Sequence, residues 1–133
     1  MFDPKTRILI ADDILTMRKL IWKVFRELGY TDITEAGNGS LAWDALEKAN
    51  PPIQLIVSDW NMPVMTGIDF LRKVRADQRF NKIPFIMLTA ESEDPQIIEA
   101  IKAGVSNYIC KPFTPAQLKE KLAAVHKKVN GGA

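Results

Sequence analysis

Five short apolar runs alternate with segments of helical period along the chain, and this alternation limits the fold more than any other feature. The runs have the length of strands, and several are apolar throughout, as strands covered on both faces must be. They are RILIA (7–11), ITEA (33–36), QLIVSD (54–59), PFIMLT (84–89) and NYIC (107–110). Strict alternation of strand and helix predicts parallel strands joined by right-handed crossovers. We therefore expect an α/β fold of five strands and five helices, arranged as a three-layer sandwich.

The segments between the runs carry helix signals as well as apolar spacing. Gly29 is expected to end the first helix, and Asn38 is expected to cap the second. Asp94 followed by Pro95, and TPAQ at 114–117, are typical of helix starts. The buried stripes that we predict for the first three helices are Leu20, Val24 and Leu28, then Leu41, Ala45 and Ala49, then Ile68, Leu71 and Val74.

Length and charge narrow the class of protein. A chain of 133 residues with 47% hydrophobic residues is predicted to form one domain, residues 1–133, with a core of about 5–128. The formal net charge of +2 gives no electrostatic argument for binding nucleic acid or an anionic membrane. No stretch reaches the roughly 18 apolar residues of a membrane span, and no leader segment is recognisable. We expect a monomeric cytoplasmic protein.

Chemically distinctive residues follow the ends of four predicted strands. In an open parallel sheet, ligands bind beyond the carboxyl ends of the strands. We therefore expect three carboxylates, a hydroxyl and an ammonium group to meet at one edge of the sheet. The three carboxylates are those of Asp12, Asp13 and Asp59, the hydroxyl is that of Thr89 and the ammonium group is that of Lys111; Asn61 and Glu91 follow the same strand ends.

Three ionised carboxylates a few ångströms apart repel one another unless a cation or a proton relieves them. Mg²⁺ takes oxygen ligands and keeps several waters, so it suits such a site, and a lysine suits a phosphoryl group. Simpler alternatives remain for each residue. Asp12 and Asp13 would cap the first helix, Thr89 would pack against its strand, and Lys111 would only pair with the acids.

The same residues carry a resemblance to a known family. ADD (11–13), SDWNMP (58–63), LTA (88–90) and CKPF (110–113) resemble the receiver domain of bacterial two-component response regulators. The four motifs fall in the order and spacing of that family and span nearly the whole chain. Within the family, the chain is most similar to the stand-alone regulators of chemotaxis. The resemblance implies a flavodoxin-like sheet with strand order 2-1-3-4-5.

The resemblance also implies a role for each acid. Asp59 would accept a phosphoryl group from the phosphohistidine of a histidine kinase. Asp13 and Asp59, with the backbone carbonyl of Asn61, would bind Mg²⁺ directly, and Asp12 would act mainly through a bound water. Lys111 would stabilise phosphoryl charge, and its bond to the following proline would be cis. The protein would be a signalling domain that phosphorylates and dephosphorylates itself, and not an ordinary enzyme.

A switch and an output surface are implied in the same way. Thr89 would hydrogen-bond the phosphoryl group and Tyr108 would then turn inward, while Asn61 and Glu91 would tune hydrolysis. The partner surface would comprise Ile97, Ala103, Tyr108 and Lys121.

The resemblance implies the flagellar motor switch as the partner, with a chemotaxis-type kinase upstream and a phosphatase as a further candidate partner. Relatives that bind the motor usually carry two lysines where this chain has Glu93 and Asp94. The alternative is therefore a phosphate sink, or a regulator of a target other than the motor.

Other classes fit the first strand end poorly. A nucleotide-binding oxidoreductase would need a glycine-rich turn there, and ADDILT (11–16) has no glycine. A phosphatase of the haloacid dehalogenase type also uses an aspartyl nucleophile and Mg²⁺, but its motif resembles Asp-x-Asp. The residues two positions beyond Asp12 and Asp13 are Ile14 and Leu15. We keep that enzyme only as a remote alternative.

Overall fold

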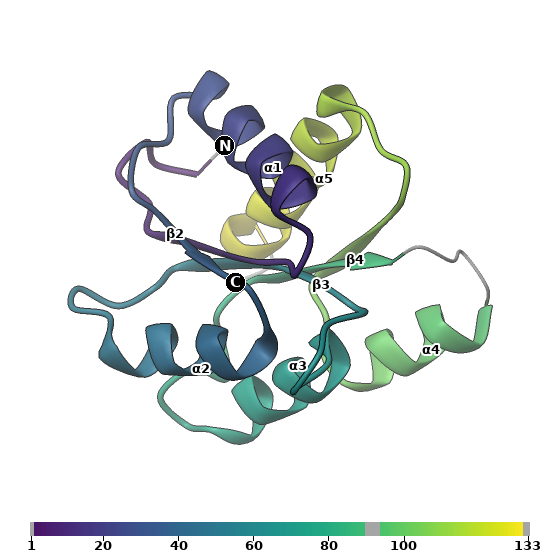
Figure 1. The fold of residues 1–133 in the computed structure, drawn as a ribbon. Helices are drawn as coiled ribbons and strands as arrows, with labels where there is room; N and C mark the ends of the chain where they lie inside the picture. The colour runs from purple at the N-terminus through teal and green to yellow at the C-terminus, as the bar shows by residue number, and fades with distance from the viewer. Residues whose placement is uncertain (1, 90–93, 132–133) are drawn as a thin grey trace.

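The computed structural model describes residues 2–89 and 94–131, in which strands and helices alternate strictly (Figure 1). The strands are β1 (Ile8–Ala11), β2 (Ile33–Ala36), β3 (Leu55–Asp59), β4 (Phe85–Thr89) and β5 (Asn107–Cys110). The helices are α1 (Leu15–Glu27), α2 (Gly39–Lys48), α3 (Gly67–Ala76), α4 (Asp94–Lys102) and α5 (Pro115–Gly131).

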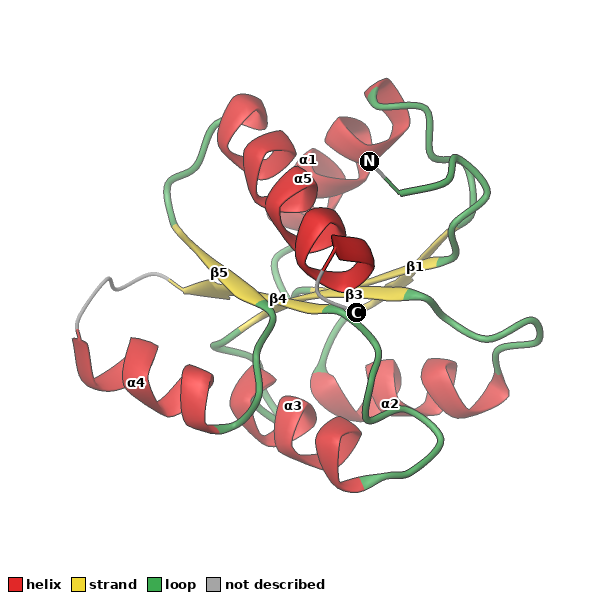
Figure 2. Cartoon of the chain, turned by 180° about the vertical axis from the view of Figure 1, so that it is seen from behind, coloured by secondary structure: helices red, strands yellow, loops and turns green. Residues whose placement is uncertain are grey.

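The five strands form one parallel sheet with the order β2-β1-β3-β4-β5. Helices α1 and α5 cover one face of the sheet, and α2, α3 and α4 cover the other (Figures 1 and 2). The predicted three-layer α/β sandwich and the strand order are therefore confirmed. The carboxyl ends of all five strands lie at the same edge, because the strands are parallel.

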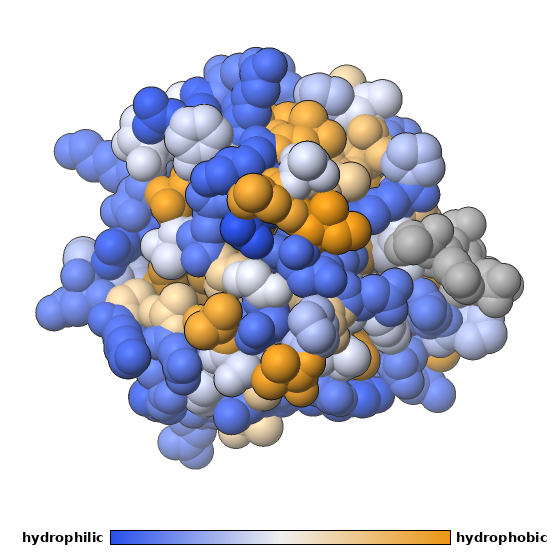
Figure 3. All heavy atoms as spheres, in the orientation of Figure 1, coloured by the Kyte–Doolittle hydropathy of each residue, from blue (hydrophilic) through white to orange (hydrophobic). Residues whose placement is uncertain are grey.

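The core consists of two apolar clusters, one on each face of the sheet. On β1, Ile8 and Ile10 pack toward α1 and α5, whereas Leu9 and Ala11 pack toward α2 and α3. This alternation explains why the strands are continuously apolar, since neither face is exposed to water. Hydrophobic side chains reach the face drawn in Figure 3 only in small groups among hydrophilic residues. None of the described helices is both long enough and apolar enough to cross a bilayer.

The predicted stripe is correct for α3, where Ile68, Leu71 and Val74 are all buried. It is wrong for α1 at Leu20, which is 39% exposed. The helix is turned so that Ile21, Val24 and Phe25 are buried against the sheet. Apolar residues on α1 fall in overlapping stripes, and the face carrying the bulky Phe25 is the one that packs.

The stripe predicted for α2 is also wrong, because Leu41 is 53% exposed. The residues buried on this helix are Gly39, Ala42, Trp43 and Leu46. The Trp43 ring packs edge-on against Phe80, with a centroid distance of 5.6 Å. Burial of a tryptophan and a leucine removes more apolar area from water than burial of the predicted alanines would, and this decides the rotation of the helix.

Helix ends follow the predicted signals. The Asn38 side chain accepts a hydrogen bond from the backbone N–H of Leu41 at 2.9 Å, as expected for an N-cap. At the start of α5, Thr114 and Gln117 form a reciprocal capping box, with donor–acceptor distances of 2.8 and 3.1 Å. Helix α1 ends just before Gly29, whose φ of 100° lies in the left-handed region. Helix α4 starts at Asp94 as predicted.

Candidate functional site

The residues predicted at the strand ends converge at the carboxyl edge of the sheet. Asp12 directly follows β1, Asp59 ends β3, Thr89 ends β4 and Lys111 directly follows β5. Asp12, Asp59 and Thr89 are almost fully buried, with exposed fractions of 0%, 3% and 3%. Burial of so many polar groups at one place is uncommon in a core, and it marks this edge as the functional site.

Three carboxylates form a cluster within this site. Asp12, Asp13 and Asp59 each offer one oxygen, and these oxygens all lie within 4.8 Å of one another. Asp13 is exposed while the other two are buried, so the cluster opens to solvent on the Asp13 side. Clustered carboxylate oxygens with access to water are the donor set that a hard divalent cation such as Mg²⁺ prefers.

Asp12 also anchors the loop that follows β1. Its Oδ1 accepts a hydrogen bond from the backbone N–H of Ile14 at 2.9 Å, two residues further on. The N-cap position of α1 is occupied by Ile14, whose side chain makes no capping bond. The helix-capping alternative is therefore wrong in its simple form, because neither aspartate is the N-cap. Asp12 therefore shapes the loop through Oδ1 as well as belonging to the cluster.

Lys111 lies between the two buried acids. Its Nζ is 3.0 Å from Asp59 Oδ1 and 3.4 Å from Asp12 Oδ2. The Lys111 side chain is only 14% exposed, so these contacts are weakly screened by solvent. One ammonium group balances one carboxylate, which leaves the cluster with excess negative charge when all three acids are ionised. Lys111 therefore does pair with the acids, but its single charge does not replace that of a bound cation.

Burial is the main cause of a raised pKa at Asp59. Lys111 opposes the rise through its hydrogen bond and its charge, and the negative charge of Asp12 adds to it. The net effect is a raised pKa, so the ionised form of Asp59 destabilises the folded protein. A cation bound at the cluster would remove part of that cost.

Gly67 determines the path of the backbone beside Asp59. Its N–H donates to the carbonyl of Trp60 at 2.8 Å, which folds the chain after β3 back on itself. A Cβ atom at position 67 would lie 2.0 Å from the backbone oxygen of Asp59, far inside van der Waals contact. Trp60 itself points into the core and is 7% exposed. Gly67 was not predicted as a site residue, although a lone glycine at a helix start was a usable signal.

Arg18 is a second residue at the site that was not predicted from the sequence. From α1, its Nη1 donates to the backbone carbonyl of Asp12 at 2.8 Å, and its Nε donates to Glu35 at 3.1 Å. These bonds fix the loop that carries Asp12 and Asp13 against the end of β2. Arg18 is six residues from Asp12, and a charged residue on a helix gives no sequence signal for such a contact.

The predicted switch and partner residues lie to one side of the acid cluster. The Thr89 hydroxyl donates to Gln96 Oε1 on α4 at 2.9 Å. Tyr108 and Lys121 are half-buried, with the Lys121 ammonium 5.2 Å from the centre of the tyrosine ring. Ile97 is half-buried on α4, and Ala103 lines a separate pocket between α3 and α4.

Further predictions concern Asn61, the Lys111–Pro112 bond and the acids before and at the start of α4. Asn61 is exposed in the loop after β3, and the Lys111–Pro112 bond is cis, as the resemblance implied. Glu91 and Glu93 lie outside the described residues, as does the side chain of Asp94.

Comparison with known proteins identifies the family to which this arrangement belongs. The sequence profile of the response regulator receiver domain matches residues 8–123. The chain belongs to this family. It is 50% identical over 119 residues to the chemotaxis protein CheY1 of Helicobacter pylori, a match that covers 90% of this chain and 95% of that protein. It is therefore a CheY-like receiver domain of the chemotaxis type.

Solved structures give the same result for the fold. The chemotaxis regulator CheY4 of Vibrio cholerae superposes with a TM-score of 0.83 at 31% identity, covering 91% of this receiver domain and 98% of that chain. The receiver domain of the sensor histidine kinase PA1611 from Pseudomonas aeruginosa, solved with a magnesium ion in its active site cleft, has a TM-score of 0.80 at 27% identity. That match covers 92% of this chain and 98% of that one. The haloacid dehalogenase alternative is left without support.

Proposed function

We propose that this receiver domain acts as a cytoplasmic response regulator of chemotaxis, in which Asp59 accepts a phosphoryl group from the phosphohistidine of a chemotaxis-type kinase. The observation that carries the proposal is the position of Asp59: its buried carboxylate lies in a cluster of three acids and contacts Lys111 at 3.0 Å. Burial of like charges at one edge of a sheet costs free energy, and such an arrangement is typical of a functional site. The chemotaxis relative described above supports the pathway.

The cluster suits Mg²⁺ by its donor chemistry. We assign direct binding to Asp13, Asp59 and the backbone carbonyl of Asn61, with Asp12 acting mainly through a water. The carboxylate oxygens are close enough to share one small cation, and the magnesium-bound receiver domain of PA1611 supports the assignment by analogy. When bound, the ion supplies positive charge that offsets the repulsion between the acids and an incoming phosphoryl group.

Transfer then needs little beyond positioning. A carboxylate oxygen of Asp59 attacks phosphorus, an O–P bond forms, and the P–N bond to the donor histidine breaks. The electron pair returns to the imidazole ring, which leaves. The Lys111 ammonium, which pairs with the Asp59 carboxylate before transfer, pairs with a phosphoryl oxygen after it. The Thr89 hydroxyl donates a hydrogen bond to another phosphoryl oxygen. Hydrolysis reverses the modification when water attacks phosphorus, and we assign Asn61 and Glu91 to control that approach.

We place the output on the surface of α4, β5 and α5. Tyr108 lies on β5, which pairs with the strand that ends at Thr89, and its ring is half-buried beside Lys121. Binding of a partner that prefers the inward ring must favour phosphorylation in turn, by linkage. The flagellar motor switch is the partner that we propose first.

A second candidate role is favoured by Asp94, the first residue of α4, and by Glu93, which precedes it in the sequence. Glu93 and Asp94 carry negative charge where motor-binding relatives usually carry lysines. A phosphate sink, or a regulator of a target other than the motor, needs the same phosphorylation site but not a positively charged docking surface. The two roles therefore differ only in the partner.

The phosphorylation itself is tested with a small phosphoryl donor. Acetyl phosphate and Mg²⁺ are expected to add one phosphoryl group to the protein by intact-mass analysis. EDTA and Asp59→Asn should each abolish the addition, whereas the control variant Asp69→Asn, at an exposed aspartate on α3, should be labelled normally. Labelling of Asp59→Asn to the same extent, or labelling unaffected by EDTA, would contradict the proposal.

A further inference from the structure

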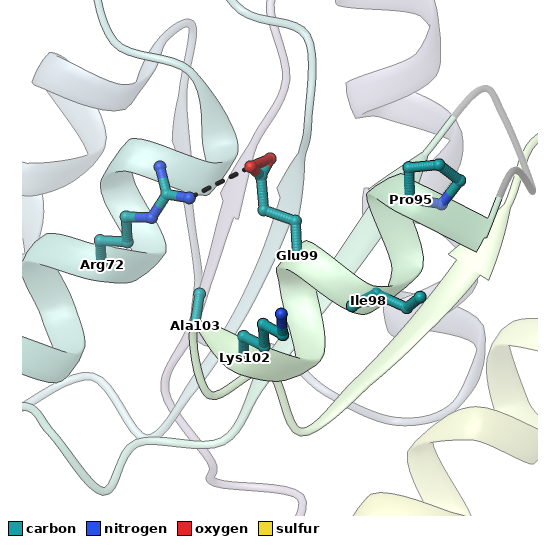
Figure 4. Close-up of a pocket in the computed structure, with 6 residues that line it drawn as sticks. All are labelled: Arg72, Pro95, Ile98, Glu99, Lys102 and Ala103. Carbon is teal, nitrogen blue, oxygen red and sulfur yellow. Dashed lines mark ion pairs between the residues drawn. The ribbon is translucent and has the colours of Figure 1, made fainter.

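Helix α4 is attached to the rest of the molecule by few described contacts. Of its side chains that the structure describes, only Ala100 is buried, and Ile98 and Ile101 are 49% and 59% exposed. A pocket of about 440 Å³ lies between α4 and α3, as Figure 4 shows. Such a helix can move without disrupting a core, because it contributes little to one.

One ion pair crosses this pocket. Glu99 on α4 lies 3.2 Å from Arg72 on α3, and both side chains are about half exposed (Figure 4). Exposed ion pairs contribute little to stability, because water screens them and both side chains lose conformational freedom. The Arg72–Glu99 pair is therefore a weak tether.

A more buried contact links α4 directly to the phosphorylation site. The Thr89 hydroxyl, at the end of β4, donates to Gln96 Oε1 in the first turn of α4 at 2.9 Å. Thr89 is 3% exposed and Gln96 is half-buried, so the bond is partly shielded from water. A hydroxyl carries one proton and can donate it to one acceptor at a time. A hydrogen bond from Thr89 to a phosphoryl oxygen on Asp59 must therefore displace the bond to Gln96.

We propose that Gln96 is a positioning residue that acts as a latch: it holds the Thr89 hydroxyl in the resting state and releases the first turn of α4 when a phosphoryl group takes that hydroxyl. The inference rests on the proposed function, because it assumes a phosphoryl group on Asp59. It adds to that function a specific competitor for the switch hydroxyl and a direct route from the site to α4. In this proposal, α4 has one arrangement when the Thr89 hydroxyl donates its proton to Gln96 and another when it donates that proton to the phosphoryl group.

The proposal predicts the direction in which loss of the Thr89–Gln96 bond shifts the equilibrium between the resting and phosphorylated states. The bond to Gln96 stabilises the resting state, so its removal must favour the phosphorylated state by the free energy that the bond contributes. A neutral hydrogen bond of this kind corresponds to a change of about two- to tenfold in an equilibrium constant. Gln96→Met keeps the length of the side chain and removes the acceptor. This variant should bind the phosphoryl mimic beryllofluoride about two- to tenfold more tightly.

The test is titration of the full chain with beryllofluoride in the presence of Mg²⁺, followed by tryptophan fluorescence, to which Trp60 beside the acceptor contributes. The gain from Gln96→Met should disappear when Thr89 is replaced by valine, which has no hydroxyl, and should persist when it is replaced by serine. Glu99→Gln is the matched control, because it breaks the weak tether of α4 without touching Thr89. A second readout needs no metal: hydrogen exchange of the α4 amides should be faster in metal-free Gln96→Met.

The outcomes separate the latch from the function on which it rests. Equal affinities in the unsubstituted and Gln96→Met chains, an equal gain in the Thr89→Val background, or an equal gain from Glu99→Gln would overturn the latch alone. Failure of the unsubstituted chain to bind beryllofluoride would overturn the proposed function and the latch together.

Discussion

Lys111 Nζ lies 3.0 Å from Asp59 Oδ1, although β4 separates their two strands in the sheet. The long lysine side chain crosses the end of β4 and reaches Asp12 as well, at 3.4 Å. A single cation thus partly compensates two buried acids that belong to different strands. The stability of this edge of the sheet should therefore depend on Lys111 when no metal is bound.

Replacement of Lys111 by methionine should destabilise the metal-free protein at neutral pH by about 3 kcal/mol, because it leaves two buried carboxylates without their cation. Urea unfolding in EDTA measures this change. Lys119→Met, at an exposed lysine on α5, is the control and should change stability little. Equal midpoints for the two variants would show that the Lys111 contacts contribute nothing to the fold.

Asp59→Asn should make the metal-free protein more stable at neutral pH. The pKa of Asp59 is raised in the folded state, mainly by burial, so its ionised form destabilises the fold above that pKa. The penalty falls as the pH drops through the raised pKa, and it vanishes once Asp59 is protonated in both the folded and the unfolded states. The gain from asparagine should shrink in the same way. Thermal unfolding of both chains across acid and neutral pH checks this, and a gain independent of pH would refute the explanation.

Gly67→Ala should cost about 1–3 kcal/mol and reduce phosphorylation of Asp59, because the new Cβ would lie 2.0 Å from the Asp59 carbonyl oxygen. The backbone beside the acceptor must shift to accommodate it. At Gly37 the nearest atom to a new Cβ is at 3.7 Å, so Gly37→Ala is a fair control for the loss of a glycine. Urea unfolding and acetyl phosphate labelling would give the two readouts. A Gly67→Ala chain that matches the Gly37→Ala chain in both would count against the close approach.

The negative charges of Glu93 and Asp94 predict how fast a peptide from the motor switch associates with the protein. If Glu93 and Asp94 weaken attraction to an acidic peptide from the motor switch, their joint replacement by lysine should speed association about tenfold at low salt. Stopped-flow mixing of the peptide with the beryllofluoride-loaded protein measures this rate. Equal rates for the two chains would show that the charge reversal is harmless and would favour the motor role over the alternatives.

The sheet and the convergence of the site could be predicted from the sequence because both follow from the alternation of strands and helices. Once the strands are parallel, residues at their ends must share an edge, and this brings Asp12, Asp59 and Lys111 together. The rotations of α1 and α2 were predicted wrongly. Apolar residues at spacings of three and four form overlapping stripes, and the choice between them depends on which side chains fill the space against the sheet, as Trp43 does.

The contacts that determine the detailed geometry of the site could not be predicted from the sequence, for a related reason. The bond from Arg18 to the Asp12 carbonyl, the approach of Gly67 to Asp59 and the bond from Thr89 to Gln96 all join residues from different elements. Each depends on the distance and angle between those elements, to within an ångström. Residue type and spacing along the chain do not encode such distances.

Chemical mapping of the phosphoryl acceptor tests the role of Asp59. Borohydride reduces an acyl phosphate, with loss of phosphate, and converts the phosphorylated aspartate to homoserine, which peptide mass spectrometry can locate. After treatment with acetyl phosphate and Mg²⁺, we expect homoserine at position 59 and unchanged aspartate at positions 12 and 13. Homoserine at position 12 or 13, or none at any position in a protein that has gained a phosphoryl group, would contradict the assignment of Asp59 as the acceptor.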